Sequence, residues 1–394
     1  MKRIPTFCLF MLMVVFSPLA IDVFLPAVPQ MATELATPTG SVQAIVAIFI
    51  LSMGFGQLLA GPLSDRYGRK PLAMTGVVIY FIAALGCAWA VNVEMLWAMR
   101  VLQGFGTCAI AVAAYSGVRD RYQGPKLAAI YSYLNGVICV IPALAPMLGG
   151  VITETLGWRA NFELMALYAL VVGIILWRGL PETRPDNTVV GKRLLSISQY
   201  RPILAHPQFQ FYVAQMTLTF TIILAYVSYS PDVLMVQMQQ SPLAFSMWFG
   251  SNAAINIAGA FLAPTVVKHL GNRRSLLIGV SQCALAAVAV LAGLNLSHPL
   301  AFMAPVYLAS LGFCIILAIS SGSAMAPFGE RAGTASALLG MLQMSGAAIL
   351  LGLISLLPMS PQACLAFTMV LPALWWLLFS RRRGYALVKQ SLQS

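Results

Sequence analysis

Two charged residues lie within long apolar stretches of the sequence, where a charge is costly. Asp22 is the only acidic residue in the apolar stretch at 6–30, and Arg100 lies in the stretch at 93–116. A charged side chain inside a bilayer usually marks an ion pathway, a proton relay or an ion pair. At 1.5 Å per residue, both lie about 12 Å from the predicted outer ends of their helices. We predict that Asp22 binds and releases a proton and that Arg100 tunes it directly or through hydrogen bonds, with a fixed ion pair as the alternative.

Two further acidic residues have simpler interpretations. Glu163 is the second candidate for a proton-carrying group, but it lies one helical turn from Arg159. This spacing more simply predicts a local ion pair at the surface. Asp120 stands between Arg119 and Arg121, which predicts a solvated cluster at a helix end.

The composition defines the broad class of the chain. Of its 394 residues, 60% are hydrophobic and only 9% are charged, whereas about a quarter of the residues in a soluble domain are charged. The chain is therefore predicted to be an all-α integral membrane protein. Its net charge of +12 would suit nucleic acid, but the cations occur in short clusters between apolar stretches. We expect no nucleic-acid partner.

The apolar stretches can be counted as membrane spans. A helix needs about 20 apolar residues to cross the bilayer, and the sequence contains twelve such stretches. They are 6–30, 41–63, 71–91, 93–116, 124–150, 159–180, 208–230, 242–266, 275–294, 299–326, 333–357 and 362–380.

The distribution of cations predicts the orientation of these spans. If the N-terminus is cytoplasmic, 21 of the 23 Lys and Arg residues fall on the cytoplasmic side, leaving Arg159 outside and Arg100 within a span. This bias follows the positive-inside rule. We expect both termini to be cytoplasmic. The first apolar stretch lacks a convincing small-residue cleavage site, so it is predicted to remain as the first helix.

A polar interval divides the spans into two sets of six. We predict an N-terminal six-helix bundle at 1–182, a cytoplasmic linker at 183–207, a C-terminal bundle at 208–380 and a cytoplasmic tail at 381–394. Repeated halves of this kind are expected to bind their substrate between them near the middle of the membrane.

A compact charged loop separates the second and third spans. Asp65 has Arg66 and Arg69 beside it, which provides partners for its charge at the membrane surface. A weak echo occurs in the second half, where aligning Gly271 with Gly68 places Lys268 at the position of Asp65. The loop residues that form a recognisable pattern are Gly61, Asp65, Arg66, Gly68, Arg69 and Lys70.

This loop resembles the signature loop of the major facilitator superfamily, and the segment at 100–106 is similar to the fourth-span motif of that family. The segment at 21–29 resembles the Bcr/CflA branch of drug/proton antiporters. The fifth span resembles the antiporter motif of the family's exporters, although Ala145 replaces the usual glycine. The motif residues present are Asn135, Pro142, Pro146, Gly149 and Gly150.

The resemblance implies the major facilitator fold, with twelve helices in two six-helix bundles around a central cavity. It implies that the charged loop is a conformational latch and that the fifth span bends to seal the cavity. It also implies secondary active multidrug efflux in the bacterial inner membrane, in exchange for protons, by a chain that acts as a monomer and has no cofactor. A carrier for a sugar or other small metabolite is the alternative, since importers also have the loop.

Several polar residues of the second half are candidates for contact with such a substrate, together with Asp22. A mostly apolar pocket with a few polar groups suits variable, amphiphilic ligands. Helix packing is an equally good interpretation of each residue. The candidates are Tyr226, Tyr229, Asn252, Asn256 and Gln343.

A membrane enzyme is a less suitable class for this chain. No His-Glu-x-x-His motif or cysteine cluster is present, and the seven cysteines are scattered through the predicted spans. We therefore expect no metal site. No nucleotide-binding P-loop is present either, so transport is expected to use an ion gradient.

Overall fold

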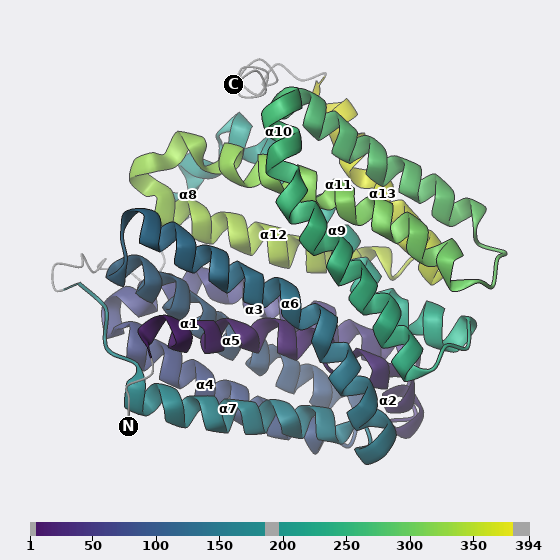
Figure 1. The fold of residues 1–394 in the computed structure, drawn as a ribbon, viewed down its shortest axis with the longest axis horizontal. Coiled ribbons are helices and arrows are strands. Elements are labelled where there is room, and N and C mark those ends of the chain that lie inside the picture. Colours follow the sequence, from purple (N-terminus) through teal and green to yellow (C-terminus); the bar gives the residue numbers. More distant parts are fainter. Residues whose placement is uncertain (1–4, 186–196, 381–394) are drawn as a thin grey trace. The chain divides into compact units, whose positions relative to one another are not determined.

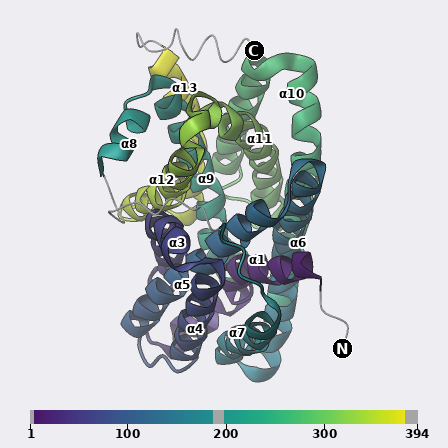
Figure 2. The same cartoon turned by 90° about the vertical axis from the view of Figure 1, so that its left-hand side faces the viewer.

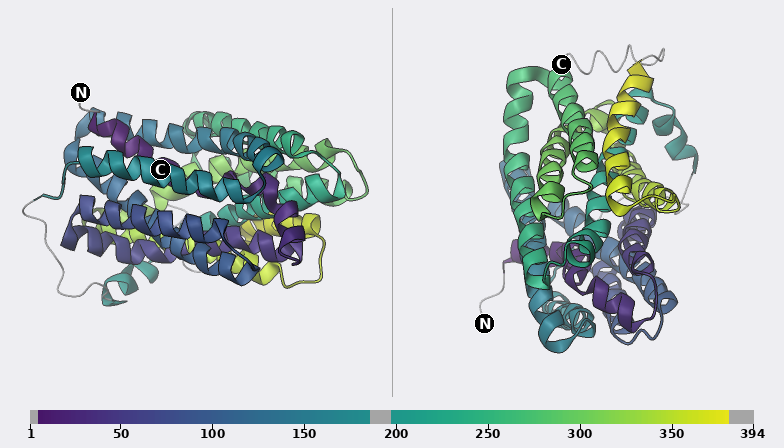
Figure 3. Two further views of the ribbon diagram at one scale, coloured as in Figure 1. Left: turned by 90° about the horizontal axis from the view of Figure 1, so that it is seen from below. Right: turned by 90° about the vertical axis from the view of Figure 1, so that its right-hand side faces the viewer.

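The computed structural model describes residues 5–185 and 197–380, and all regular structure in these ranges is helical (Figure 1 and Figure 3). The helices of the first half are α1 (Thr6–Asp22), η1 (Leu25–Ala27), α2 (Val28–Glu34), α3 (Thr39–Tyr67), α4 (Arg69–Ala88), α5 (Val93–Arg121), α6 (Gly124–Leu156) and α7 (Arg159–Gly179). The others are α8 (Ile197–Leu204), α9 (Pro207–Pro231), η2 (Asp232–Gln237), α10 (Pro242–Ala292), α11 (Pro299–Met325), η3 (Ala326–Arg331), α12 (Ala332–Ile354) and α13 (Pro361–Ser380).

The described helices account for each predicted span. Eleven helical stretches are long and apolar enough to cross a membrane. The longest, α10, has 51 residues and contains one non-helical residue, Gly271, at φ 77° and ψ 162°. Figure 2 shows α10 doubling back, and its parts at 242–270 and 272–292 are each long enough to span. The prediction of an all-α membrane fold is therefore confirmed.

The chain divides into two compact units. Unit 1 comprises Met1–Leu195 together with Pro242–Gly250, and unit 2 comprises Ser196–Ser241 together with Ser251–Ser394. In unit 1, α5 packs against α1, α3 and α4, while α7 packs against α4. In unit 2, α9 packs against α11, α12 and α13. The exact domain limits that the sequence suggested stay a prediction, and the tail at 381–394 lies outside the described residues.

The turn in α10 repeats the geometry of the charged loop. Gly68, between α3 and α4, has φ 105° and ψ 163°, close to the values of Gly271. A positive φ of this size favours glycine, because other residues meet steric strain there. The weak sequence echo between the two loops therefore corresponds to a shared backbone conformation.

Close helix packing is also repeated between the halves. A Cβ atom at Gly106 of α5 would lie 2.8 Å from the carbonyl oxygen of Gly76 in α4. In unit 2, a Cβ atom at Gly312 of α11 would lie 2.6 Å from the carbonyl oxygen of Gly279 in α10. Small residues let helix backbones approach closely in membranes, where packing replaces the hydrophobic effect as the main attraction. Each half thus uses one pair of glycines to join its third and fourth spans.

We predict that Gly106→Ala lowers thermal stability, because the added methyl group would force α5 away from α4. Overpacking of this kind typically costs about 1–3 kcal/mol. The apparent Tm of purified protein, followed by size-exclusion chromatography after heating, measures the effect. Gly40→Ala is the control, since a Cβ atom there would meet nothing within 4 Å. Equal melting of both variants would contradict the packing argument.

Candidate functional site

Asp22 lies at a break in the first span. Helix α1 ends at Asp22, and the chain continues through η1 into α2. Pro26 and Pro29 favour this break because proline has no backbone N–H to donate to a helix. The residue is only 4% exposed, and within the described residues its carboxyl group makes no hydrogen bond or ion pair. The predicted proton-carrying acid is therefore buried and unpaired at an irregular point of the helix.

Helix α6 contacts this break through a glycine of the predicted antiporter motif. A Cβ atom at Gly149 would overlap the carbonyl oxygen of Val23, the residue that follows Asp22. The carbonyl of Gly149 accepts a hydrogen bond from Thr153 Oγ1 at 2.7 Å, and Thr153 Oγ1 accepts one from Asn161 Nδ2 at 2.8 Å. This part of α6 is therefore tied to α7 while its glycine faces the break.

The neighbouring motif residues face other partners. A Cβ atom at Gly150 would lie 3.1 Å from Ser246 Oγ, at the start of α10 and within unit 1. Ser246 Oγ lies 2.8 Å from the carbonyl oxygen of Pro146. Pro142 lies inside α6, and Asn135 Oδ1 accepts a hydrogen bond from the Tyr115 hydroxyl at 3.3 Å. The motif thus presents adjacent glycines to the first span and to α10.

Arg100 is completely buried between two aromatic rings. Its guanidinium carbon lies 5.0 Å from the ring centre of Phe24 and 4.4 Å from that of Phe49. Arg100 Nε donates to the carbonyl of Ile45 at 3.3 Å, and Nη1 donates to Gln103 Oε1 at 2.6 Å. Nη2 has no hydrogen-bond partner among the described residues.

The structure does not show an ion pair between the two membrane charges. Among the described residues, the ion pairs do not include Asp22 or Arg100. Instead, Arg100 contacts Phe24, which follows Asp22 by two residues at the same break. The alternative of a fixed ion pair between spans one and four therefore does not match this structure.

The charged loop is organised around Arg69. Its side chain is only 4% exposed, and Nη1 lies 2.7 Å from Asp65 Oδ1 while Nε lies 2.7 Å from Asp120 Oδ2. Nη1 also donates to Ser64 Oγ at 2.9 Å. The prediction of a solvated Asp120 is wrong, since its side chain is 6% exposed. The fold brings the end of α5 beside the start of α4, a contact that local sequence does not reveal.

Glu182 completes this cluster and was not among the predicted site residues. Its Oε1 accepts from the backbone N–H of Arg69 at 2.9 Å, and Oε2 accepts from that of Lys70 at 3.1 Å. The N–H groups of Thr183 and Arg184 also donate to Oε1. Burial raises the pKa of Glu182, but the four backbone hydrogen bonds outweigh it and lower the pKa from its ordinary value. The carboxylate thus caps the N-terminus of α4, as expected for an anion at a helix start.

The other loop residues surround this cap. A Cβ atom at Gly68 would overlap Glu182 Oε2, so only glycine fits there without displacing the carboxylate. Lys70 Nζ donates to the carbonyl of Trp177 at 2.9 Å. Arg184 Nη1 donates to the carbonyl of Arg66 at 2.7 Å. Gly61 lies inside α3, where a Cβ atom would meet nothing within 4 Å.

A second polar cluster fixes the C-terminal end of the first span. Glu34, at the end of α2, accepts from Arg159 Nη1 at 2.6 Å and from Trp158 Nε1 at 2.8 Å. The guanidinium of Arg159 also lies 4.3 Å from the ring centre of Trp158. The predicted local pair between Arg159 and Glu163 is therefore wrong, because the fold supplies a partner from a distant segment.

The predicted substrate residues lie in unit 2, apart from Asp22. Asn252 Oδ1 accepts from Ser310 Oγ at 2.8 Å, which joins α10 to α11. Asn256 Nδ2 donates to the carbonyl of Asn252 at 3.0 Å. These contacts favour helix packing for the asparagines. Tyr226 and Tyr229 are buried on α9, and Gln343 is half-buried on α12.

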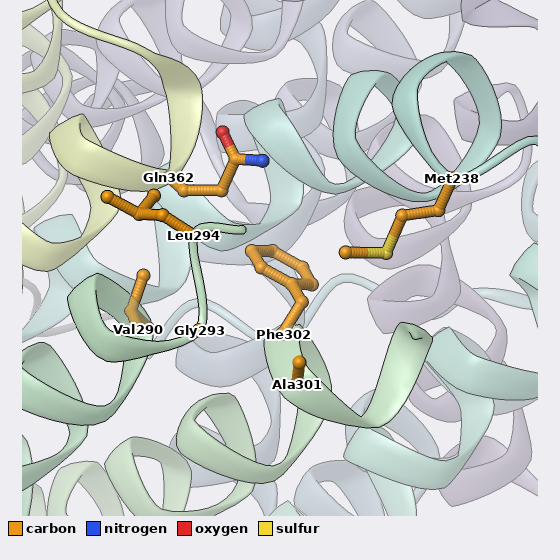
Figure 4. Close-up of a pocket in the computed structure, with 7 residues that line it drawn as sticks. All are labelled: Met238, Val290, Gly293, Leu294, Ala301, Phe302 and Gln362. Atoms are coloured by element: carbon orange, nitrogen blue, oxygen red, sulfur yellow. The ribbon is translucent and has the colours of Figure 1, made fainter. Parts of the chain in front are cut away.

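Unit 2 also contains a small pocket, shown in Figure 4. Its cavity volume is only about 10 Å³, far below the range of about 300–1,000 Å³ that is usual for ligand pockets. None of the predicted substrate residues lines it. The lining residues are Met238, Val290, Gly293, Leu294, Ala301, Phe302 and Gln362.

The described chain contains no group of side chains suited to a metal ion. All seven cysteines are free, and five of them are buried. Their positions within packed helices suit the ordinary role of cysteine as a small apolar residue.

The fold and sequence together define a class of membrane carrier. Residues 10–351 match the Major Facilitator Superfamily. The chain belongs to this superfamily, and it is a transporter rather than an enzyme.

Relatives within the superfamily carry names that describe drug resistance. The chain is 31% identical to a chloramphenicol resistance protein of Pseudomonas aeruginosa over 81% of its own length and 76% of the relative. It is 29% identical to the multidrug resistance protein MdtL of Citrobacter koseri over 87% of its length and 86% of the relative. An MdtL of Salmonella typhi is 28% identical over 91% and 90%. The resemblance to the multidrug exporters of this superfamily is confirmed at this level.

Solved structures share the fold at low sequence identity. A D-xylose-proton symporter has a TM-score of 0.75 and 15% identity, over 95% of this chain and 97% of its own. A peptide transporter in complex with alafosfalin has a TM-score of 0.76 and 15% identity, over 98% and 94%. These likenesses confirm the fold alone.

We predict that Asp120→Ala destabilises the protein, because it leaves the buried Arg69 guanidinium with one carboxylate fewer. Removing one partner of a buried pair typically costs about 3–5 kcal/mol. Thermal melting of the purified variant measures the loss. Glu163→Ala is the control, since Glu163 is exposed and makes no ion pair among the described residues. Comparable melting of the two variants would show that Asp120 is not structural.

The lowered pKa of Glu182 predicts a dependence of stability on pH. A carboxylate with a lowered pKa stabilises the folded state above its unfolded pKa, and this contribution is lost as the pH falls through the folded pKa. The difference in Tm between the parent and Glu182→Gln should therefore be constant from neutral pH down to about 5 and shrink below about 4.5. Melting curves across this range test the prediction. A difference that grows on acidification would contradict it.

Proposed function

We propose that the chain is a secondary active multidrug efflux transporter that exchanges small amphiphilic drugs for protons by alternating access. Chloramphenicol-like and bicyclomycin-like compounds are the expected substrates, with lipophilic cations as a further class. The names of the relatives support drug export. The observation that carries proton exchange is the buried, unpaired Asp22 at the break in the first span.

The surroundings of Asp22 suit a proton-carrying group. No ion pair has to be broken before its carboxyl group takes up or releases a proton. The backbone after Asp22 already leaves the α-helix, so a change of charge can be accompanied by a local rearrangement without disrupting a continuous helix. We propose that binding of a proton to Asp22 and binding of the drug exclude each other.

Arg100 is proposed to support the same role from α5, which packs against α1. It contacts Phe24 at the break, and its Nη2 atom keeps an unsatisfied donor. Arg100 therefore acts on Asp22 through its contact with Phe24 at the break rather than through a permanent ion pair.

The charged loop acts as the latch between transport states. Arg69 is held inside unit 1 by Asp120, whereas the Asp65 side chain remains 43% exposed. Asp65 therefore keeps room for a further partner in another state while Arg69 stays in place. Gly68 and Lys70 shape the start of α4 around Glu182, and the remaining latch residues are Gly61 and Arg66.

The antiporter motif is proposed to control leakage beside the proton site. Gly149 lets α6 touch the backbone next to Asp22, and Gly150 faces the start of α10. Pro142 and Pro146 each remove a helix hydrogen bond, which makes α6 easier to bend. Asn135 secures the helix nearer its N-terminus through Tyr115.

The remaining assignments follow from the family. Tyr226, Tyr229, Asn252, Asn256 and Gln343 are proposed to contact the substrate together with Asp22. The chain is a multi-pass membrane protein. We propose that it functions as a monomer in the bacterial inner membrane, with both termini cytoplasmic.

Proton release in inverted membrane vesicles tests this function. The vesicles are energised with a respiratory substrate, and chloramphenicol, a lipophilic cation and a sugar are added in turn. We predict that the drugs discharge the pH gradient in the parent and that Asp22→Asn abolishes this response, because the amide cannot carry a proton. Glu163→Gln is the control and should respond like the parent.

The outcomes separate the alternatives. A full response by folded Asp22→Asn would remove Asp22 from proton coupling. A response to the sugar alone would indicate a carrier for sugars or other small metabolites. If no compound gave a response, the chain would still belong to the superfamily, but the proposal of drug/proton exchange would be rejected.

A further inference from the structure

The two matching loops differ sharply in their charge. Gly68 and Gly271 share the same unusual backbone conformation, and cations follow both glycines. The loop at Gly68 is rich in acidic partners, whereas the loop at Gly271 has none nearby in sequence. The two loops thus share a backbone conformation, but only the loop at Gly68 has acidic residues that can balance its cations.

In unit 1 the chain neutralises its own loop. Arg69 binds Asp65 and Asp120, and Glu182 accepts the backbone N–H groups of Arg69 and Lys70. Three carboxylates therefore converge on the start of α4. The loop needs no external anion to satisfy its buried cation.

In unit 2 the corresponding cations have no such partners. Lys268, His269, Arg273 and Arg274 are exposed around the turn at Gly271. In the part of the chain that the structure describes, none of the three Lys and Arg residues makes an ion pair or a side-chain hydrogen bond. They form a compact positive surface, which we call the basic turn.

The sequence explains why the basic turn is unpaired. Nine of the eleven acidic residues precede residue 196, and only Asp232 and Glu330 follow it. Asp232 begins η2 and accepts a hydrogen bond from Gln237. The basic turn is followed further on by Arg381, Arg382 and Arg383, which lie outside the described residues. The second half therefore has far fewer carboxylates than cations.

We infer that the basic turn binds the phosphate headgroup of an anionic phospholipid. It lies between two membrane-spanning parts of α10, so its side chains are placed at the level of lipid headgroups. Lys and Arg next to a membrane span attract anionic lipid, with a gain of about fivefold in affinity for each charge. The positive-inside rule accounts for the side of the membrane on which these cations lie. The rule does not explain why the basic turn lacks acidic partners, since the loop at Gly68 follows the same rule and has them.

Lipid retention by the purified full-length protein tests this inference. The protein is equilibrated in mixed micelles that hold equal amounts of phosphatidylglycerol and phosphatidylcholine with matched acyl chains. Native mass spectrometry then measures the ratio of the two lipids that remain bound. The parent should prefer phosphatidylglycerol, and K268Q/R273Q/R274Q should reduce this preference by fivefold or more.

A matched variant controls for the total charge. R121Q/K126Q/R178Q removes three exposed cations from unit 1 and should change the preference by less than twofold. R273K/R274K keeps the charges and should retain the parent's preference, which tests the site even if the neutral variant folds poorly. An equal loss in the unit 1 control, or no preference in the parent, would overturn the inference. Displacement of the lipid by excess inorganic phosphate would assign the basic turn to a soluble anion and would also overturn it.

Discussion

The close contact between Gly149 and the Val23 carbonyl is the constraint around which the surroundings of Asp22 are built. A membrane protein has to satisfy its backbone polar groups internally, so a broken helix needs support from its neighbours. Here α6 supports the break from one side, and Arg100 lies against Phe24 on it. Beyond the break, Glu34 is held by Trp158 and Arg159. The first span is therefore irregular in its middle and firmly attached at its C-terminal end.

Charge is handled differently in the two halves despite their shared backbone pattern. Unit 1 pairs its buried Arg69 with Asp65 and with Asp120 from a distant helix, whereas in unit 2 the cations of the basic turn are exposed. The glycine pairs show that both halves keep the same close packing between their third and fourth spans. Backbone geometry is thus retained where side-chain chemistry has diverged.

The helices could be predicted from the sequence because bilayer thickness imposes a length of apolar residues that is easy to detect. The charged loop was also recognisable, since its residues are close together in the chain. The pairing of Arg69 with Asp65 could be predicted, since the two are four residues apart. The long-range partners of Arg69 and Arg159 could not, because Asp120 and Glu34 are brought to them only by the packing of whole helices. Glu182 could be noticed in the sequence as an acidic residue in the polar segment that ends the sixth span. Its role as a cap could not be predicted, because it depends on the position of α4. Contacts between residues that are close in the sequence could be predicted, whereas contacts between distant helices could not.

Helix α10 contributes to both units, and this has a consequence for biosynthesis. Its first nine residues, Pro242–Gly250, belong to unit 1, where Ser246 contacts the carbonyl of Pro146. Domains generally assemble in the order in which a ribosome makes them. The first unit nevertheless stays incomplete until the start of the eighth span has been synthesised and inserted. Until then, the newly inserted N-terminal half has the part of α6 around Pro146 uncovered in the membrane. A polypeptide divided at the central linker would likewise separate unit 1 from its segment Pro242–Gly250.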